Sequence, residues 1–213
     1  MLFYDSVGPN PKVVRVFMAE RGISGIPTET VDIRGGVNRQ PEFLARNPSG
    51  QCPALALDNG LILAEITAIC EYLDEVGPAG MTLIGATPEE RAETRMWMRR
   101  IDLNILEPMA NGFRFAEGLK MFQNRLHCIP QAADDLKATA QEKLTWLDGL
   151  MAGKTYICGD RLTLADILLF VWIEFGAQVG QPQPAGLDHL TAWHARIAAR
   201  PSAAASANPQ NGL

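Results

Sequence analysis

The residues best suited to bind a ligand lie around Pro53 and Glu65. Pro53 follows Gly50-Gln51-Cys52 and stands at the start of a strand-like run, where the missing N–H of proline is tolerated. From Glu65 onward the apolar residues take helical spacing, which predicts a helix. The order strand, turn, strand, helix brings the helix N-terminus beside the Pro53 loop. Because the free N–H groups of a helix N-terminus favour negative charge, this stretch predicts a carboxylate site.

A hairpin and a helix are the elements expected to position this site. Apolar runs at Ala54–Leu57 and Leu61–Leu63 flank Asp58-Asn59-Gly60. Asn-Gly tolerates positive φ at both central positions of a tight turn, which is typical of a β-hairpin. The following half-buried helix has its apolar positions at Ile66, Ile69, Cys70 and Leu73.

The chain before the hairpin alternates strand and helix. Met1–Asp5 predicts a short strand, Lys12–Arg21 a helix, and the β-branched run Thr28–Ile33 a second strand. A further short helix is expected to begin near Gln40. This order favours a small mixed sheet with a parallel βαβ start and an antiparallel finish.

The chain after the hairpin shows helical patterns, and no later run is as strand-like. Thr87-Pro88-Glu89-Glu90 combines a threonine cap, a first-turn proline and acids that suit the helix dipole. Thr163 precedes Asp166 at the spacing of a capping box. Pro108 is expected to kink a long helix, and Pro201 to end the last one. The expected division is a first domain over 1–76, a linker over 77–87, an all-helical domain over 88–201 and a loose tail over 202–213.

Composition excludes several classes of function. A net charge of −5 among 213 residues argues against a general nucleic-acid or anionic-membrane surface. No window is apolar enough to span a bilayer, and the first ten residues lack the pattern of a secretory signal. The four cysteines and three histidines are scattered, without C-x-x-C or metal-ligand spacing. We therefore expect a cytoplasmic protein with reduced thiols and no metal.

The stretch from Asn47 to Asp74 resembles the glutathione-binding domain of cytosolic glutathione transferases. The family pattern is N-P-x-G-x-V-P, a hairpin, then L-x-E-S-x-A-I and Y-L; here it is NPSGQCP at 47–53, LAEITAI at 63–69 and Tyr72-Leu73. The run GDRLTLADI at 159–167 is similar to the capping box of the family's second domain. The resemblance implies a thioredoxin-like N-terminal domain (βαβαββα) with a cis bond before Pro53, followed by an all-α domain. The glutathione site resembles that of the phi- and theta-like classes.

In this family a hydroxyl or similar donor near the first helix holds the glutathione sulfur as a thiolate. A free thiol has a pKa of about 8.5, and a donor together with a helix N-terminus lowers it. The position of the usual serine or threonine falls on Gly8, so Ser6 and Asn10 are the candidate catalytic residues. Gly8-Pro9-Asn10 resembles the loop of bacterial transferases that reduce disulfides. The structural alternatives are Asn10 as a cap before Pro11 and Ser6 as a turn residue, and for Ser6 the structural role is favoured.

For the peptide part of glutathione, the resemblance implies contacts from Asn38, Arg39, Gln51, Cys52, Pro53, Glu65 and Ile66. Asn38 and Arg39 would meet the glycine carboxylate, the Cys52 backbone the cysteinyl amide, and Glu65 the γ-glutamyl amine. Ile66 replaces a serine whose lost charge-assisted hydrogen bond is worth about 1.5–3 kcal/mol. Arg39 as a surface charge, Gln51 as a loop amide and Glu65 as a dipole partner are the structural alternatives.

The resemblance also implies a second, apolar site between the domains, formed by Val7, Met109, Phe113 and Phe115. The expected function is that of a homodimeric glutathione-dependent transferase for detoxification. It would conjugate glutathione to a small hydrophobic electrophile or use it to reduce a disulfide. The alternative is a non-catalytic binding or regulatory protein of the same fold, favoured by the missing hydroxyls at Gly8 and Ile66. A dithiol enzyme is excluded, because the first helix carries no C-x-x-C or equivalent cysteine.

Overall fold

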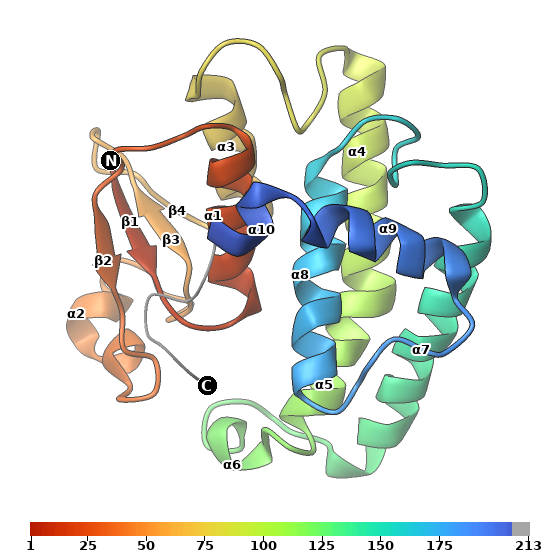
Figure 1. Ribbon diagram of the computed structural model, residues 1–213. Helices are drawn as coiled ribbons and strands as arrows, with labels where there is room; N and C mark the ends of the chain where they lie inside the picture. Colours follow the sequence, from red (N-terminus) through yellow and green to blue (C-terminus); the bar gives the residue numbers. More distant parts are fainter. Residues whose placement is uncertain (206–213) are drawn as a thin grey trace. The chain divides into compact units, whose positions relative to one another are not determined.

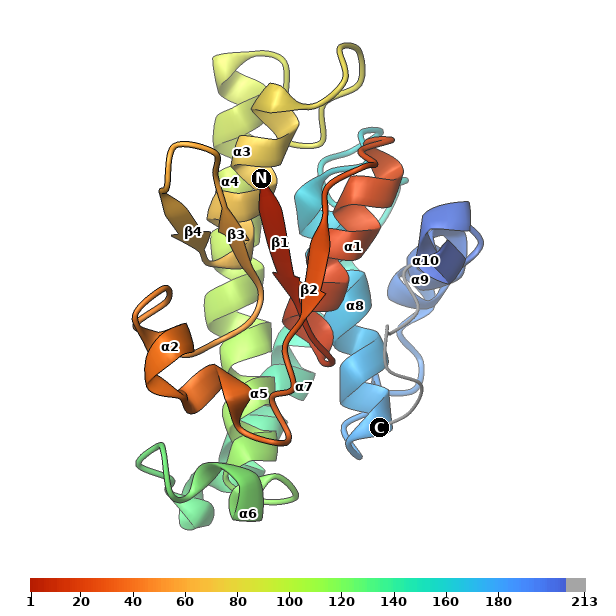
Figure 2. The same cartoon turned by 90° about the vertical axis from the view of Figure 1, so that its left-hand side faces the viewer.

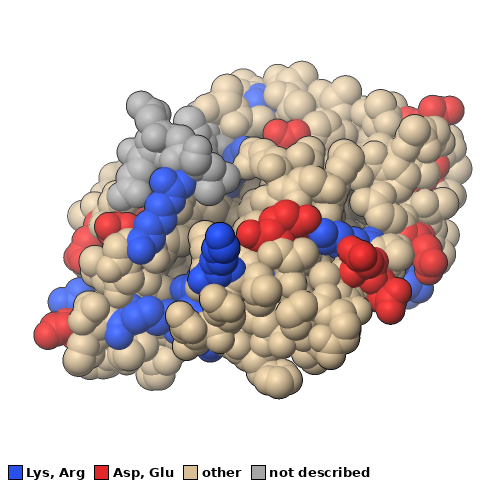
Figure 3. All heavy atoms as spheres, turned by 90° about the horizontal axis from the view of Figure 1, so that it is seen from below, with Lys and Arg blue, Asp and Glu red and all other residues tan. Residues whose placement is uncertain are grey.

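The computed structural model describes residues 1–205, which form two compact units. One unit comprises Met1–Ile84 together with the segment that begins at Ala199, and the other comprises Gly85–Ala198. The first contains the sheet, and the second is built from helices (Figure 1). Basic and acidic side chains both occur on the face shown in Figure 3. In residues 1–205 no helix combines the length and the apolar character needed to cross a bilayer.

The first unit is built on a four-stranded sheet in the order β2-β1-β3-β4. Its strands are β1 Leu2–Asp5, β2 Thr28–Thr30, β3 Ala54–Ala56 and β4 Ile62–Ala64. β1 is parallel to β2 and antiparallel to β3, and β3 is antiparallel to β4. β2 ends earlier than predicted, because Asp32 Oδ1 accepts the N–H groups of Arg34 and Gly35 (3.0 and 2.8 Å) and so starts a turn.

Helices cover both faces of this sheet (Figures 1 and 2). They are α1 Pro9–Glu20, the 3-10 turn η1 Val37–Arg39, α2 Pro41–Leu44 and α3 Ile66–Val76. Tyr4 and Ala54 point to one face, where they form a cluster with Val31 and with Phe43 of α2. The helices α1 and α3 pack together on the other face. The order βαβαββα confirms the predicted thioredoxin-like domain.

The second unit confirms the all-helical prediction. Its elements are α4 Pro88–Ile101, the π-helix η2 Asp102–Leu106, α5 Glu107–Arg114, α6 Leu119–Phe122, the 3-10 turn η3 Pro130–Ala132, α7 Ala133–Leu150, α8 Leu164–Gln178 and α9 Asp188–Ala198. Every residue of α8 from Leu164 to Ile173 is buried, so this helix forms the core of the unit. Apart from two isolated bridges around Gly159, the described part of the unit contains no β-structure.

A π-helix, η2, lies just before Pro108, where the sequence predicts a kink. Pro108 has no N–H to donate to the carbonyl of Asn104, so the regular ladder fails there. In the wider turn, the Glu107 N–H donates to the Asp102 carbonyl instead. The Asn104 side-chain amide donates to the carbonyl of Arg100 (2.8 Å), one turn earlier in the helix.

The threonine cap predicted for α4 and the capping box predicted for α8 are both present, and the α4 cap is also a capping box. At the start of α4, the Glu90 N–H donates to the Thr87 hydroxyl (3.2 Å) and the Glu90 carboxylate accepts from the Thr87 N–H (3.4 Å). At the start of α8, the Asp166 carboxylate accepts the N–H and the hydroxyl of Thr163 (2.9 and 3.0 Å). It also accepts the Ile157 N–H and the Trp193 indole N–H. Burial raises the pKa of Asp166, while these four donors favour its charged form.

Three local predictions differ from the structure. The hairpin is present, but the Leu57 N–H donates to the Leu61 carbonyl across a three-residue loop, and only Gly60 in it has positive φ. The first helix starts at Pro9, not Lys12. The last long helix ends at Ala198, and Pro201 starts the short helix α10, Pro201–Ala205. The rest of the expected tail, 206–213, lies outside the described residues.

Candidate functional site

One end of the sheet brings the predicted site residues together. Tyr4 pairs with Ala54, and Ala54 pairs with Ala64, so the end of β1, the start of β3 and the end of β4 are neighbours. The loop after β1, the Pro53 loop before β3 and Glu65 after β4 therefore meet at the same edge. Both α1 and α3 begin at this edge, so two helix N-termini contribute to it.

Asn10 provides the hydrogen-bond donors in the first turn of α1. Gly8 is the N-cap, with φ of 107° and no side-chain capping bond, so Asn10 is not the cap that sequence analysis considered. Pro9 and Pro11 stand on either side of Asn10 and have no N–H. The backbone N–H and the side-chain amide of Asn10 are therefore the N–H donors of the segment Pro9–Pro11.

Gly8 occupies a backbone conformation that explains why serine is absent there. A φ of 107° is rarely adopted by residues with a side chain, although the space around a Cβ at Gly8 is empty. The Ser6 hydroxyl is fully buried and donates to the Val31 carbonyl (2.7 Å). This bond joins the loop to the end of β2, so Ser6 has a structural role, whereas Asn10 remains half-exposed.

Asn38 and Arg39 support the loop that precedes Pro53. The Asn38 side-chain amide donates to the Gly50 carbonyl (2.6 Å), and Arg39 Nη1 donates to the Ser49 carbonyl (3.3 Å). The Asn47 amide holds the carbonyl of Gln51 (2.8 Å), while the Gln51 side chain is exposed. Asn38 Oδ1 is buried and has no partner among residues 1–205. Asn38 therefore stabilises the conformation of this loop.

The Pro53 loop has the predicted cis bond between Cys52 and Pro53. The Cys52 thiol is half-buried, and burial together with the nearby charge of Asp5 raises its pKa to about 12. A thiol with this pKa stays protonated at neutral pH. The Cys52 thiol is therefore unsuited to act as a nucleophile at neutral pH.

Glu65 is the N-cap of α3 and is the one non-glycine residue with positive φ among residues 1–205. Its φ of 69° costs about 1–2 kcal/mol relative to the right-handed region. The Glu65 side chain makes no capping bond and is exposed. The Ile69 N–H donates to the Glu65 carbonyl, so the N–H groups of Ile66, Thr67 and Ala68 precede the first helical bond.

Asp5 and Arg15, which were not among the predicted site residues, hold the start of the first loop. Arg15 Nη1 donates to Asp5 Oδ1 (2.5 Å) and to the Ser6 carbonyl (3.1 Å). The Ser6 N–H donates to the same Asp5 oxygen (2.8 Å). Burial raises the pKa of Asp5, and Arg15 opposes this rise. The sequence did contain a signal for this pair: Asp5 ends a buried strand, and Arg15 follows in the next helix.

The four residues expected at an apolar second site lie in different units. Val7 is buried in the first unit, whereas Met109, Phe113 and Phe115 belong to the second. Met109 is 1 % exposed, and its carbonyl accepts from Gln181, so it is part of the helical core. Phe113 packs edge-on against Phe122 and Phe175. Neither unit by itself brings the four residues into one pocket.

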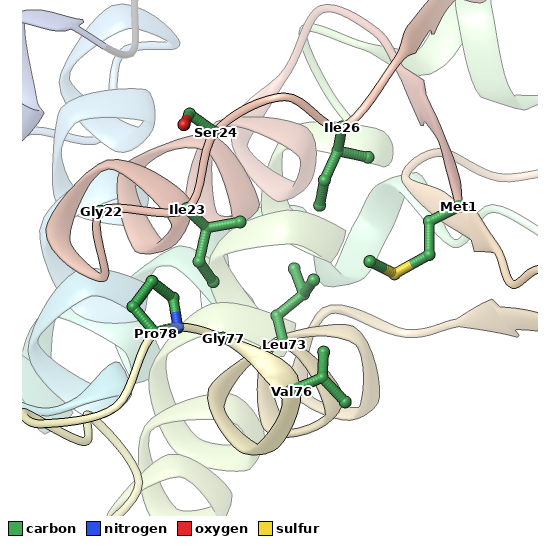
Figure 4. Close-up of a pocket in the computed structure, with 9 residues that line it drawn as sticks. All are labelled: Met1, Gly22, Ile23, Ser24, Ile26, Leu73, Val76, Gly77 and Pro78. Atoms are coloured by element: carbon green, nitrogen blue, oxygen red, sulfur yellow. The ribbon is translucent and has the colours of Figure 1, made fainter.

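A shallow apolar pocket of about 410 Å³ lies elsewhere in the first unit (Figure 4). It is lined by Met1, Gly22, Ile23, Ser24, Ile26, Leu73, Val76, Gly77 and Pro78. These residues flank the C-terminal ends of α1 and α3, whereas the candidate site lies at their N-terminal ends. Residues 1–205 contain no group of three His, Cys, Asp or Glu side chains that could hold a metal ion.

Known proteins similar to this chain share its architecture. Family models described as the glutathione S-transferase N-terminal and C-terminal domains match residues 8–76 and 127–201. Glutathione S-transferase 2 of Saccharomyces cerevisiae is 34% identical over 209 residues, which cover 95% of this chain and 87% of that protein.

Two solved structures are also similar. A glutathione S-transferase domain-containing protein from Marinobacter aquaeolei VT8 has 36% identity and a TM-score of 0.87, covering 95% of this chain and 99% of that one. Gtt2 from Saccharomyces cerevisiae has 30% identity and a TM-score of 0.88, covering 97% and 100%.

Proposed function

Because the chain belongs to the glutathione S-transferase family, we propose that it binds glutathione at the sheet edge described above and activates its thiol for transfer. Family membership supports glutathione-dependent transferase activity in general. The proposal assigns the steps to particular residues: α1 and Asn10 stabilise the thiolate, and the Pro53 loop and α3 bind the peptide. No metal is required for this mode of nucleophile activation.

The observation that carries the proposal is the position of Asn10 between Pro9 and Pro11. A thiolate at the start of α1 needs hydrogen-bond donors, and the two prolines supply none. Asn10 supplies two groups, its backbone N–H and its half-exposed amide. Ser6 is a weaker candidate because its hydroxyl already donates to Val31.

The open N-terminus of α3 suits the γ-glutamyl end of glutathione. Its N–H groups favour the γ-glutamyl carboxylate, and the exposed Glu65 suits the amine. The Cys52 backbone would pair with the cysteinyl amide, and Asn38, Arg39 and Gln51 would lie around the glycine carboxylate. Ile66 adds no hydroxyl here, so we expect weaker binding than with a serine at this position.

The activated thiolate serves two related reactions. In conjugation, it attacks an electrophilic carbon of a small apolar substrate and displaces a leaving group or opens a double bond. In disulfide reduction, it attacks one sulfur, forms a mixed disulfide with it and releases the other sulfur as a thiolate. A second glutathione thiolate then attacks the glutathione sulfur of the mixed disulfide, which gives oxidised glutathione and frees the second thiol. Asn10 in a Gly-Pro-Asn loop favours the second reaction.

Calorimetric titration with reduced glutathione near neutral pH tests the proposal. We expect saturable binding in the micromolar to low millimolar range, and a raised pKa of the bound thiol in Asn10→Ala. Asn59→Ala is the matched control, because Asn59 lies in the hairpin loop at the other end of β3 and β4. Lack of binding at millimolar glutathione would refute the proposal.

A non-catalytic binding or regulatory role is the alternative. It is favoured by Gly8 and Ile66, which remove the hydroxyls found at both family positions. Glutathione binding without turnover of any electrophile or disulfide would support it. The full proposal includes a cytoplasmic homodimer with a role in detoxification, and sedimentation of the purified chain tests the dimer.

A further inference from the structure

A buried ion pair connects β1, the first loop and α1. The side chains of Asp5 and Arg15 are 3 % and 12 % exposed. Arg15 Nη1 donates to both the Asp5 carboxylate and the Ser6 carbonyl, and the Ser6 N–H donates to the Asp5 carboxylate. The Val31 N–H also donates to the Asp5 carbonyl (2.8 Å). These bonds fix the point at which the chain leaves β1 toward Asn10.

The same pair lies at the sheet edge to which the proposed function assigns the glutathione sulfur. Asp5 is the last residue of β1, at the edge where the Pro53 loop meets the first loop. Its carboxylate is near enough to Cys52 for its charge to disfavour a thiolate there. The groups that act on Asp5 include Arg15 from α1 and the Ser6 N–H from the loop. An unbalanced Asp5 would disfavour any thiolate bound at this edge.

We propose that Asp5 and Arg15 are a positioning pair for the glutathione site: the pair holds the Ser6–Asn10 loop in place, and Arg15 cancels the charge of Asp5 beside the sulfur. This inference rests on the proposed function. It assigns a task to two residues that do not touch the ligand. Removal of the Arg15 charge alone and removal of the Asp5 charge alone should therefore shift the pKa of the bound thiol in opposite directions.

A second buried ion pair in the same unit provides the control. Arg21 and Asp74 are joined by a contact of 2.7 Å, and their side chains are 5 % and 7 % exposed. Arg21 also donates to the carbonyls of Asp74 and Pro78 (3.0 and 3.1 Å). This pair joins the C-terminal ends of α1 and α3, away from the candidate site. Its loss should destabilise the unit without changing the site's electrostatics.

The test measures the pKa of bound glutathione from the ultraviolet absorption of its thiolate, with S-methylglutathione as the blank. We expect Arg15→Gln to raise this pKa by about one unit and Asp5→Asn to lower it by about one unit. Arg15→Lys keeps the charge and should restore a value near that of the unaltered chain. The double variant Asp5→Asn/Arg15→Gln removes both charges and should also restore it. Arg21→Gln should leave the pKa unchanged while lowering the midpoint of urea unfolding.

The inference is wrong if Asp5→Asn leaves the pKa unchanged or shifts it in the same direction as Arg15→Gln. Because Arg15→Gln leaves a buried carboxylate unpaired, it can prevent folding. In that case the single variant Asp5→Asn is compared with the double variant, which has two neutral amides. An equal pKa in these two variants would overturn the inference. Failure of the unaltered chain to bind glutathione would instead refute the proposed function.

Discussion

The N-termini of four helices of this protein, α1, α3, α4 and α8, are of two kinds. Those of α4 and α8, in the helical unit, are closed by capping boxes in which the carboxylate of Glu90 or Asp166 accepts the N–H of the threonine at the N-cap. Those of α1 and α3, in the sheet unit, begin after Gly8 and Glu65 and have no side-chain capping bond. Both of these residues have positive φ. The closed ends therefore have their side-chain bonds within the fold, whereas the open ends leave the N–H donors that we propose for a ligand.

The closed and open ends are therefore expected to affect different properties of the chain, namely its stability and its ligand binding. A closed end lowers the free energy of the folded state without a ligand. An open end leaves backbone donors unpaired and, at Glu65, adds backbone strain. If the comparison holds, changes at the closed ends should alter stability, and changes at the open ends should alter ligand binding.

The largest effect is expected for Asp166→Ala at the closed end of α8. It leaves four buried donors without their acceptor, including the Ile157 N–H and the Trp193 indole. We expect a loss of roughly 3–5 kcal/mol in the free energy of unfolding, measured with urea. Asp166→Asn keeps one acceptor oxygen and should lose less. Equal stability of Asp166→Ala and the unaltered chain would contradict the assignment of this end as structural.

The open end of α3 should respond in the opposite sense. Glu65→Gly removes the strain at φ of 69° and should raise stability by about 1 kcal/mol. It also removes the carboxylate proposed for the glutathione amine, so affinity should fall about tenfold or more. Glu65→Gln is the control, because it keeps the strain and removes only the charge. A stabilised Glu65→Gly variant with unchanged affinity would refute the functional part of the comparison.

The closed end of α4 should show a smaller version of the α8 result. Thr87→Ala removes the acceptor of the Glu90 N–H at an exposed position. We expect a loss of about 1 kcal/mol in the free energy of unfolding, with unchanged glutathione affinity. Thr87→Ser, which keeps the hydroxyl, should retain most of the stability. A change in affinity would show that capped and open ends are not independent.

The smallest effect concerns pH and the other end of α1. Burial alone would raise the pKa of Glu20, but hydrogen bonds from Arg200 and Ser202 and the charge of Arg200 lower it below its ordinary value of 4.5. A lowered folded-state pKa stabilises above the unfolded value, and this contribution disappears as the pH falls through the folded value. The contribution of Glu20 to the free energy of unfolding should amount to about 0.2–1 kcal/mol, since Arg200 is partly exposed.

Urea unfolding at a series of acidic pH values measures this contribution. The unaltered chain should lose stability more steeply than Glu20→Gln below a pH of about 4.5. Glu29→Gln is a suitable control because Glu29 is exposed on β2. Parallel curves for Glu20→Gln and the unaltered chain would contradict the lowered pKa.

Features encoded by neighbouring residues were predictable from the sequence. The capping boxes of α4 and α8, the hairpin and the overall order of elements follow from short-range spacing. The start of α1 was misplaced because Pro9 and Pro11 resemble loop residues, although prolines are tolerated in the first turn of a helix. The π-helix depends on which carbonyl accepts the Glu107 N–H ahead of Pro108, and spacing alone does not specify this.

Contacts between distant residues were not predictable in the same way. Asn38 was expected at a ligand, but its amide holds the carbonyl of Gly50, twelve positions along the chain. The burial of the Ser6 hydroxyl depends on Val31, which becomes its neighbour only when β2 pairs with β1. The Asp5–Arg15 pair likewise depends on how α1 packs beside β1. The sequence therefore indicated which loops meet at the candidate site but not the contacts of each side chain.

Pro9 and Pro11 also affect the entropy of the candidate site. In the unfolded chain, both residues are already confined to φ of about −65°, which suits the first turn of a helix. Ordering the residue between them therefore loses less conformational freedom than ordering an ordinary loop residue. If a ligand binds there, its affinity is reduced less by the immobilisation of its partner. The first turn of α1 is thus preorganised by two residues that donate no backbone hydrogen bond.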